Sequence, residues 1–303
     1  MSRVAAIDCG TNSIRLLIAD IADGTFREVY RNMQIVRLGQ GVDQNKAFHP
    51  DAIDRTLKAV ADFSTEIARR GVSKIRFCAT SATRDAANRD LFIDGVNSLL
   101  GIKPEVISGE EEAALSFFGA TKELHQSGAP YLVIDIGGGS TEFVFGTEKV
   151  DFAKSQNIGC VRMSERHFSS LPPSANEIAN AQRDIDEAIS EAAKLVPITE
   201  AQTLIAVAGT ATTVAAAALG LNEYDRYSIH LSRVTAEKTH EVTQRFLHMN
   251  RQEIAALPYM HEGRVDVIAA GSLVLSRIME LSGAKEFVAS ESDILDGMAW
   301  SLA

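Results

Sequence analysis

Two stretches of this sequence follow one pattern, and this repeat constrains the fold more than any other feature. Residues 8–13 read DCGTNS and residues 135–140 read DIGGGS. Each stretch follows an apolar run typical of a β-strand and precedes another, so each predicts a β-hairpin with a polar, glycine-containing turn. A repeat of this kind indicates two copies of one structural unit.

Two further pairs of segments repeat in the same order. Residues 79–83 (ATSAT) and 208–212 (AGTAT) each follow a predicted strand. The segment 105–108 (EVIS) has a weaker counterpart at 286–290 (EFVAS), and each leads into a helical pattern. Each half therefore predicts three strands, a helix, a strand, a helix, a strand and a helix. We expect an α/β fold of two duplicated domains with a cleft between them.

The domain boundary is predicted in the polar stretch 125–130, HQSGAP, where glycine and proline favour a linker. This gives an N-terminal domain at 1–126 and a C-terminal domain at 127–303, the second enlarged by a helical insertion between Thr235 and Leu281. The uncharged stretch 201–222 is long enough to span a membrane. Its alanines and threonines drive insertion weakly, and its Gly-Thr turn favours a buried strand followed by a helix.

Composition excludes several functional classes. The 303 residues are 46% hydrophobic and 23% charged, which is typical of a globular chain. Thirty basic and forty acidic residues give a net charge of −10, which disfavours nucleic acids and anionic membranes as partners. Three widely spaced cysteines predict neither a disulfide framework nor a zinc site, and the first residues do not form a signal peptide. We expect a cytoplasmic protein.

The repeated turns are candidate phosphate-binding sites. Glycine allows successive backbone N–H groups to converge on one anion, and the aspartates that precede the turns, Asp8 and Asp135, can hold a cation or its waters. Ordinary hairpin chemistry would also place such residues there, but their occurrence in both halves favours the phosphate interpretation. The candidate phosphate ligands are Thr11, Asn12, Ser13, Gly138, Gly139, Ser140 and Thr141.

Three charged side chains near these turns have two interpretations each. Arg84 is either a surface arginine or a ligand whose guanidinium matches phosphate oxygens. Glu111, the middle of three consecutive glutamates, is either the third residue of a capping box with Ser108 or a general base for water, and the spacing slightly favours the cap. Glu142 is a β-edge carboxylate or a metal ligand, and strand alternation places it on the same side as Ser140.

Taken together, these motifs resemble the exopolyphosphatase/guanosine pentaphosphate phosphohydrolase family, within the actin–Hsp70–sugar kinase superfamily. Four stretches carry the resemblance: 6–15 (AIDCGTNSIR), 80–88 (TSATRDAAN), 106–113 (VISGEEEA) and 133–142 (VIDIGGGSTE). Weaker similarity lies at 159–162 (GCVR), 208–210 (AGT) and 264–268 (RVDVI). The matches span nearly the whole chain, and the four strong motifs in this order are highly specific.

The resemblance implies two ribonuclease-H-like domains that bind phosphate between them. It implies that Glu111 is the base that activates water, that Asp135 and Glu142 lie near a divalent metal, Mg²⁺ or Mn²⁺, and that Arg84 binds the phosphate chain. The implied activity is removal of terminal orthophosphate from inorganic polyphosphate. Two alternatives stay open: hydrolysis of guanosine pentaphosphate, and a non-catalytic sensor of guanosine polyphosphates. The three glutamates favour a hydrolase over an ATP-driven, Hsp70-like protein, which could share the glycine-rich turn.

The length of the chain adds an expectation about the substrate. Long members of the family continue for roughly 200 residues into a helical region, the size of an added domain, whereas this sequence stops at Ala303. We therefore expect short polyphosphate chains and distributive cleavage, with Arg15 and Arg264 as additional phosphate ligands. A homodimer is also expected.

Overall fold

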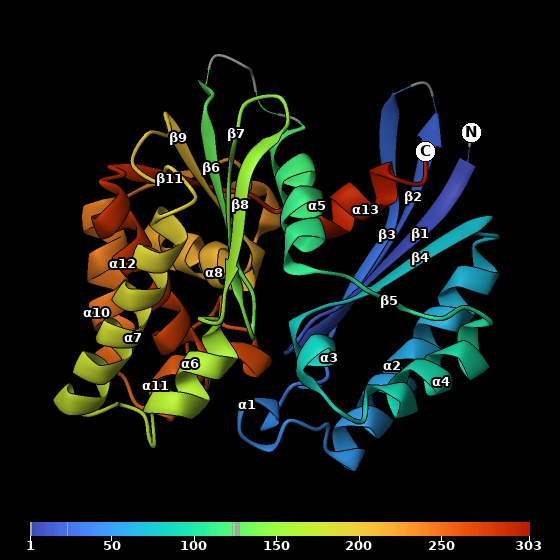
Figure 1. Ribbon diagram of the computed structural model, residues 1–303, viewed down its shortest axis with the longest axis horizontal. Coiled ribbons are helices and arrows are strands. Elements are labelled where there is room, and N and C mark those ends of the chain that lie inside the picture. Colours follow the sequence, from blue (N-terminus) through green and yellow to red (C-terminus); the bar gives the residue numbers. More distant parts are fainter. Residues whose placement is uncertain (1, 23, 123, 125–127) are drawn as a thin grey trace. The chain divides into compact units, whose positions relative to one another are not determined.

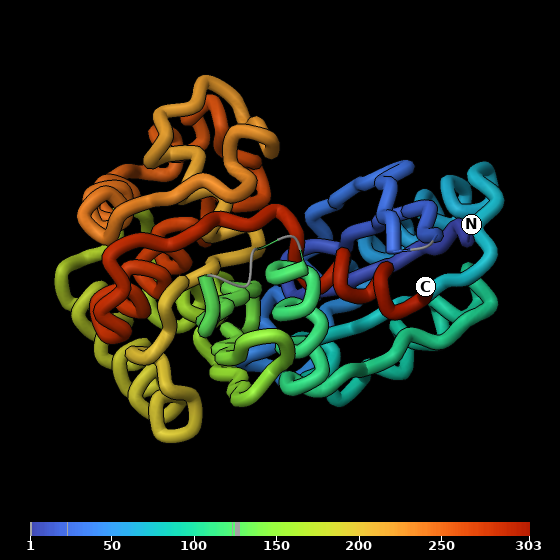
Figure 2. The backbone as a smooth tube through the Cα atoms, turned by 90° about the horizontal axis from the view of Figure 1, so that it is seen from above, coloured from blue at the N-terminus to red at the C-terminus, as the bar shows by residue number. Residues whose placement is uncertain are grey.

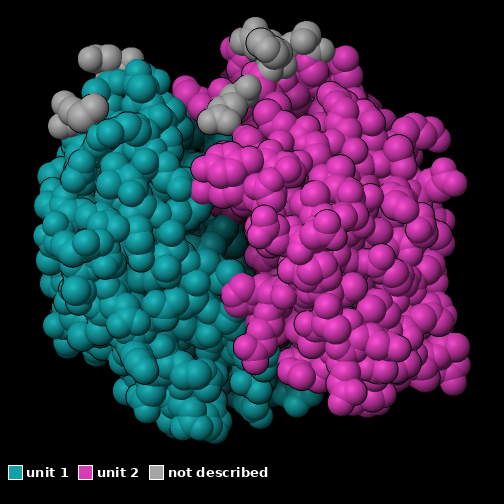
Figure 3. Space-filling model, turned by 180° about the vertical axis from the view of Figure 1, so that it is seen from behind, with its two compact units in different colours: residues 1–119, 294–303 teal, residues 120–293 magenta. Residues whose placement is uncertain are grey.

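The computed structural model describes residues 2–22, 24–122, 124 and 128–303. The chain divides into two compact units, which Figure 3 colours separately: unit 1 is Met1–Gly119 with Ile294–Ala303, and unit 2 is Ala120–Asp293. The predicted boundary lies among residues 125–127, outside the described residues. The last ten residues, which the sequence prediction assigned to the C-terminal domain, belong to unit 1. The cleft expected between the halves stays a prediction.

Unit 1 is built on a five-stranded mixed sheet (Figure 1). Its strands are β1 (Ser2–Cys9), β2 (Ser13–Ala22), β3 (Thr25–Ile35), β4 (Lys74–Ala79) and β5 (Glu105–Val106). The first three form an antiparallel meander, and β4 and β5 continue the sheet in parallel on the other side of β1, giving the order β3-β2-β1-β4-β5. The ends of β1 and β4 that carry Cys9 and Ala79 therefore lie side by side.

Helices cover both faces of this sheet. They are α1 (Val42–Asn45), α2 (Pro50–Arg69), α3 (Ser81–Asp85), α4 (Arg89–Leu100), α5 (Gly109–Thr121) and α13 (Ile294–Trp300). Helix α2 begins with Pro50, which lacks the N–H that would be unsatisfied there, and its apolar face packs Phe63 into a core shared with Phe77 and Phe92.

The C-terminal helix α13 covers the opposite face of the unit 1 sheet. Ile294, Leu295 and Met298 are buried against Val4 and Leu17. Figure 2 shows this red segment beside the blue N-terminal strands. A Cβ atom at Gly297 would lie 2.1 Å from the carbonyl oxygen of Leu115 in α5, so glycine is required where the two helices cross. The apolar side of α13 explains why it belongs to the first unit although it follows the last strand of the second.

Unit 2 repeats the same sheet with one added strand. Its strands are β6 (Tyr131–Ile136), β7 (Thr141–Gly146), β8 (Val150–Gln156), β9 (Thr203–Val207), β10 (Arg233–Thr235) and β11 (Glu286–Ala289). The order β8-β7-β6-β9-β11 matches that of unit 1, and β10 pairs antiparallel at the β11 edge. Both sheets have the ribonuclease-H-like strand order, so the predicted α/β fold with duplicated domains is confirmed.

The helices of unit 2 outnumber its strands among the described residues. They are α6 (Cys160–His167), α7 (Ala175–Ala193), α8 (Ala208–Leu219), α9 (Arg226–Ile229), α10 (Ala236–His248), α11 (Arg251–Ala255), the 3₁₀ helix η2 (Glu262–Arg264) and α12 (Ile268–Ser282). Helices α10, α11 and α12 fall in the region predicted to be inserted. The uncharged stretch 201–222 folds as β9 and α8, and no helix in the described parts of the chain is long and apolar enough to cross a bilayer.

Candidate phosphate-binding and hydrolytic site

The two predicted hairpin turns have the same backbone geometry. In unit 1, the N–H of Gly10 donates to the carbonyl of Ser13 at 3.0 Å, and in unit 2 the N–H of Gly137 donates to the carbonyl of Ser140 at 3.0 Å. Thr141, the next residue, begins β7 and donates through Oγ1 to the carbonyl of Ile158 at 2.9 Å. The repeat in the sequence therefore corresponds to a repeat in turn structure.

A segment that follows β3 supports the turn of unit 1. The N–H groups of Val36 and Arg37 donate to the carbonyl of Asn12 at 3.0 and 2.9 Å, and the N–H of Gly39 donates to the carbonyl of Thr11 at 2.9 Å. A Cβ atom at Gly39 would lie 2.3 Å from Cγ2 of Thr11, so only glycine allows this approach. The sequence analysis missed this segment, for which the only signal was the glycine itself.

The matching segment of unit 2 follows β8 and opens helix α6. The N–H of Cys160 donates to the carbonyl of Gly137 at 2.9 Å, and that of Arg162 donates to the carbonyl of Gly138 at 3.1 Å. A Cβ atom at Gly159 would lie 2.3 Å from the carbonyl carbon of Gly138. The buried Arg162 also donates through Nε to the carbonyl of Gly139 at 2.7 Å. Hydrogen bonds from the backbone of the first residues of α6 and from the Arg162 side chain therefore hold the second turn.

Two threonine hydroxyls beside the first turn are buried without a hydrogen-bond partner in the described residues: Oγ1 of Thr11 and Oγ1 of Thr83. Thr83 lies in α3, which begins just after Thr80, and the N–H of Thr80 donates to the carbonyl of Cys9 at 3.1 Å. An unsatisfied buried hydroxyl costs about 1–3 kcal/mol, so such groups mark places where a small rearrangement around a polar ligand is favourable.

The aspartates that precede the two turns have different neighbours. Asp8 lies opposite Arg15 in the β1–β2 pairing and accepts hydrogen bonds from its Nε and Nη2 atoms at 3.0 and 2.6 Å. Asp135 lies opposite Glu142 in the β6–β7 pairing, and both residues are buried. Oε1 of Glu142 accepts a hydrogen bond from Ser155 at 2.7 Å. Unit 1 therefore has an ion pair where unit 2 has two carboxylates.

The carboxylate pair of unit 2 fits a divalent cation better than Asp8 does. Like charges directly opposite each other in a sheet are destabilising, and a cation or a shared proton relieves them. Mg²⁺ is commonly held by one or two carboxylates together with substrate phosphates. Within the described residues, no group of three or more His, Cys, Asp and Glu side chains is arranged to hold a metal. The prediction of Asp8 as a metal ligand stays a prediction.

Arg84 is held at the start of helix α5. Its Nη1 atom donates to Oε2 of Glu112 at 2.7 Å and to the carbonyl of Ile107 at 3.0 Å. The Glu112 side chain is only 11% exposed. These contacts hold the guanidinium beside the residues that follow β5 and leave the Arg84 side chain 24% exposed.

The contacts of Glu111 include the predicted cap and an ion pair that the sequence did not predict. Its N–H donates to Oγ of Ser108 at 3.2 Å, which is the cap, and its carboxylate accepts from Nη2 of Arg76 at 2.6 Å. Arg76 also binds Glu105 and Ser301, so the carboxylate of Glu111, which is 46% exposed, points toward the C-terminal segment. Of the three glutamates, the structure brings Glu112 and not Glu111 to Arg84.

The spacing of apolar residues along α5 could have distinguished Glu112 from Glu111 in the sequence alone. The buried side of α5 carries Ala113, Ser116, Phe117 and Ala120, and Glu112 lies on that same side by i, i+4 spacing. Glu111 lies on the side of Ala114 and Phe118, which are exposed.

The N-terminus of helix α8 brings together polar groups in unit 2. Ala208, the first residue of α8, has a positive φ of 66°, and the helix has no side-chain cap. The guanidinium of Arg264 packs against Gly209, where a Cβ atom would lie 2.7 Å from Nη2. Nη1 of Arg264 donates to Oγ1 of Thr213 at 2.8 Å. A helix N-terminus and an arginine together form a site suited to an anion.

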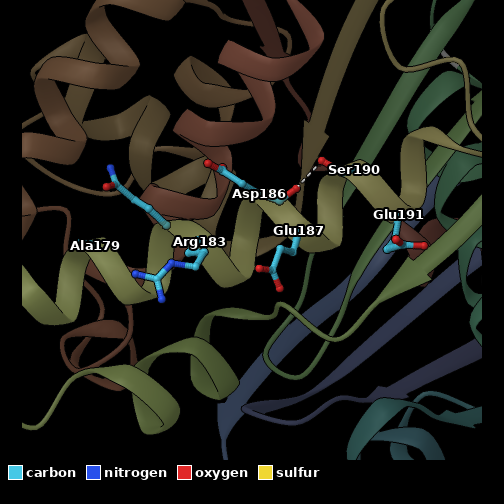
Figure 4. Close-up of a pocket in the computed structure, with 7 residues that line it drawn as sticks. Ala179, Arg183, Asp186, Glu187, Ser190 and Glu191 are labelled. Atoms are coloured by element: carbon cyan, nitrogen blue, oxygen red, sulfur yellow. Dashed lines mark hydrogen bonds between the residues drawn. The ribbon is translucent and has the colours of Figure 1, made fainter.

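Surface hollows elsewhere in unit 2 lack comparable chemistry. Figure 4 shows one that follows helix α7, where Arg183, Asp186, Glu187 and Glu191 project from consecutive turns of a single helix. Asp186 is already bound there by both Nε and Nη2 of Arg277, at 2.7 and 2.8 Å. Charged groups along one exposed helix face are typical of solvated surface, so this hollow is a poor candidate for the functional site.

Comparison with known proteins identifies the family. The model of the Ppx/GppA phosphatase family matches residues 17–302. The chain belongs to this family. It is 46% identical to exopolyphosphatase 2 of Mycobacterium tuberculosis, over all of this chain and 99% of the relative.

Two further similarities extend the comparison. The chain is 31% identical to a guanosine-5'-triphosphate,3'-diphosphate pyrophosphatase of Vibrio atlanticus, over 98% of this chain and 59% of that relative. The crystal structure of an exopolyphosphatase-like protein superposes with a TM-score of 0.95 at 44% identity, over 99% of this chain and 98% of that one. The resemblance stated from the motifs is confirmed, and the fold agrees with that of a solved homologue.

Proposed function

We propose that this protein is an exopolyphosphatase, a hydrolase that releases terminal orthophosphate from inorganic polyphosphate. The observation that carries the proposal is the pair of matched turns, each held by backbone hydrogen bonds and each associated with a charged strand pair. Family membership and the full-length similarity to exopolyphosphatase 2 support this substrate class.

In this proposal, unit 2 carries the metal-binding residues. Asp135 and Glu142 would hold Mg²⁺ or Mn²⁺, which supplies charge neutralisation for phosphate oxygens when it is bound. The N–H groups of the turn at Gly138 and Gly139, with the hydroxyl of Ser140, would donate to phosphate oxygens. The hydroxyl of Thr141, which the sequence also predicted as a phosphate ligand, instead donates its proton to the carbonyl of Ile158. Arg264 and the N-terminus of α8 would bind a further phosphate group of the chain.

Unit 1 would supply a second set of phosphate ligands and the base. Thr11, Asn12 and Ser13 would donate to phosphate from the first turn. Arg84 would bind the chain through Nε and Nη2, because its Nη1 atom already donates to Glu112 and Ile107. Water would attack the terminal phosphorus, the bond from that phosphorus to the bridging oxygen would break, and the water proton would pass to a glutamate carboxylate. The products are orthophosphate and a chain shortened by one unit.

Two glutamates are candidates for this base. The sequence predicts Glu111, whereas burial and the contact with Arg84 favour Glu112. A carboxylate that lies beside a phosphate-binding arginine is better placed for a water near the phosphate than one directed toward Arg76. We therefore propose Glu112 as the base and Glu111 as the residue that caps α5 and pairs with Arg76.

Hydrolysis of guanosine pentaphosphate is the second candidate function. It is favoured by the 31% identity to the Vibrio pyrophosphatase, which covers 98% of this chain. The same phosphate-binding residues would serve both reactions, since both break a terminal phosphoanhydride bond. A cytoplasmic location, a homodimer and a preference for short polyphosphate chains stay predictions.

The proposed function is tested by measuring orthophosphate release from tripolyphosphate, long polyphosphate, guanosine pentaphosphate and ATP in parallel. We expect the highest kcat/KM on a polyphosphate, loss of activity with EDTA, and recovery when Mg²⁺ or Mn²⁺ is added in excess. The Asp135→Asn variant serves as the negative control. A kcat/KM highest on guanosine pentaphosphate would replace the first candidate by the second, and full activity in EDTA would overturn the metal assignment.

A further inference from the structure

Arg264 and an acidic residue, Glu291, contact the same tyrosine and form no ion pair with each other in the described parts of the chain. The Nη1 atom of Arg264 donates to Thr213, and its guanidinium carbon lies 5.4 Å from the ring centroid of Tyr224. In the described parts of the chain it forms no salt bridge. Arg84 of unit 1 differs, because it is paired with Glu112 at 2.7 Å. Glu291 follows the last parallel strand of unit 2 as the glutamates follow β5 in unit 1.

The hydroxyl of Tyr224 forms a hydrogen bond with the carboxylate of Glu291. The phenolic oxygen lies 2.6 Å from Oε1 of Glu291 and 2.7 Å from Oγ1 of Thr212. An ionised carboxylate only accepts hydrogen bonds, so the single O–H of Tyr224 is donated to Glu291. The N–H of Glu291 donates to Nδ1 of His230 at 3.1 Å, which fixes the residue from its backbone side.

The protonation state of Tyr224 suits this arrangement. Burial raises the pKa of Tyr224 to about 12, so the hydroxyl keeps its proton at neutral pH and continues to donate. Tyr224 as a whole is 36% exposed, but its hydroxyl lies between Thr212 and Glu291. The ring also faces the guanidinium of Arg264, a contact of the cation–π type.

A carboxylate that paired with Arg264 would compete with any phosphate group there. The same guanidinium packs on Gly209 in the first turn of α8, whose N-terminus has no side-chain cap. An ion pair between Glu291 and Arg264 would cancel the positive charge beside that N-terminus and would place a negative charge where an anion binds.

We propose that Tyr224 is a positioning residue that holds Glu291 away from Arg264, so that the guanidinium stays available to a phosphate group of the substrate. The hydroxyl binds the carboxylate and the ring supports the arginine. The inference rests on the proposed function, in which Arg264 binds phosphate. It assigns opposite roles to the acids that follow the last parallel strands: Glu112 pairs with its arginine, and Glu291 is kept from doing so.

The Tyr224→Phe variant tests the role of the hydroxyl, because phenylalanine keeps the ring and removes the donor. We expect KM for tripolyphosphate to rise ~10-fold with kcat within about twofold of wild type, since the released Glu291 carboxylate competes with ground-state phosphate binding. In the double variant Tyr224→Phe/Glu291→Gln no charge competes, so KM should return to within about twofold of wild type. Glu291→Gln alone should bind tripolyphosphate as well as wild type or more tightly.

Two outcomes would overturn the proposal. An unchanged KM in Tyr224→Phe would show that the hydroxyl is not needed, and a double variant as weak as the single one would show that it acts through structure and not through the charge of Glu291. Calorimetric titration with tripolyphosphate in EDTA separates this inference from the proposed function. A wild type that binds tripolyphosphate in this titration but releases no orthophosphate from it when Mg²⁺ is present overturns only the proposed function, and a wild type that does not bind it overturns the role of Tyr224.

Discussion

The two hairpins differ at one position, although their turns have the same geometry. In unit 1 the residue opposite the aspartate is Arg15, and the strand pair is neutral through the bonds between Arg15 and Asp8. In unit 2 the residue opposite the aspartate is Glu142, and the strand pair carries two carboxylates. The two turns thus share one backbone geometry, while a single exchange of sign across one strand pair distinguishes unit 2, which we propose to hold a cation, from unit 1, where Arg15 neutralises the aspartate.

The largest expected effect comes from neutralising the aspartate in each hairpin. Asp135→Asn removes one of two proposed metal ligands, so we expect kcat/KM to fall ~10³-fold and the Mg²⁺ concentration for half-maximal activity to rise. Asp8→Asn removes the partner of Arg15 and should act mainly on stability, with a melting temperature lower than that of wild type. Activity measured over a series of Mg²⁺ concentrations distinguishes the two variants.

The proposal that only the hairpin of unit 2 holds the metal is wrong if Asp8→Asn raises the Mg²⁺ requirement as much as Asp135→Asn does. Such a result would mean that Asp8 belongs to the metal site, as the sequence analysis expected, and that the ion pair with Arg15 is not its main role. Circular dichroism spectra of both variants serve as the control for folding.

The sequence predicted the repeated units well because turns and strand alternation are local properties. The succession of strands and helices along each unit, including β9 and α8, and the two turns follow from residues within a few positions of one another. The opposition of Asp8 and Arg15 was also accessible, since both lie equally far from the centre of their turn, but the sequence analysis treated the aspartate alone.

Other features depended on contacts between distant residues and could not be predicted from local patterns. Helix α13 follows a strand of unit 2 and covers the sheet of unit 1, because its apolar residues complete the core around Val4 and Leu17. The pairing of Glu291 with Tyr224 joins residues 67 positions apart. The choice between Glu111 and Glu112 depends on Arg84 and Arg76, whose directions are set by the packing of α3 and β4 and not by the motif.

A second comparison concerns the neighbouring glutamates of α5. Glu112→Gln removes the proposed base and leaves a similar shape, so kcat should fall ~10²-fold, while KM changes less. Glu111→Gln should lower kcat less than about fivefold, since its carboxylate is partly exposed and engaged with Arg76. Steady-state kinetics with a polyphosphate substrate decides between them. The reverse result, with the larger loss in Glu111→Gln, would restore the assignment made from the motif.

The smallest expected effect concerns the junctions between strand and helix, where the units again differ. In unit 2, Ala208 has a φ of 66°, a left-handed conformation that costs an L-residue roughly 1–2 kcal/mol, whereas in unit 1 the residue before α3, Thr80, has a φ of −112°. Ala208→Gly relieves this strain and loses about 0.4–1 kcal/mol through the larger entropy of the unfolded chain, so the melting temperature should rise by about 1–3 °C. The matched control is Ala79→Gly, at the corresponding place in unit 1, which adds a glycine to a buried strand and should lower the melting temperature. If calorimetry shows equal destabilisation by both substitutions, Ala208 is not strained, and the two junctions are alike despite their different backbone angles.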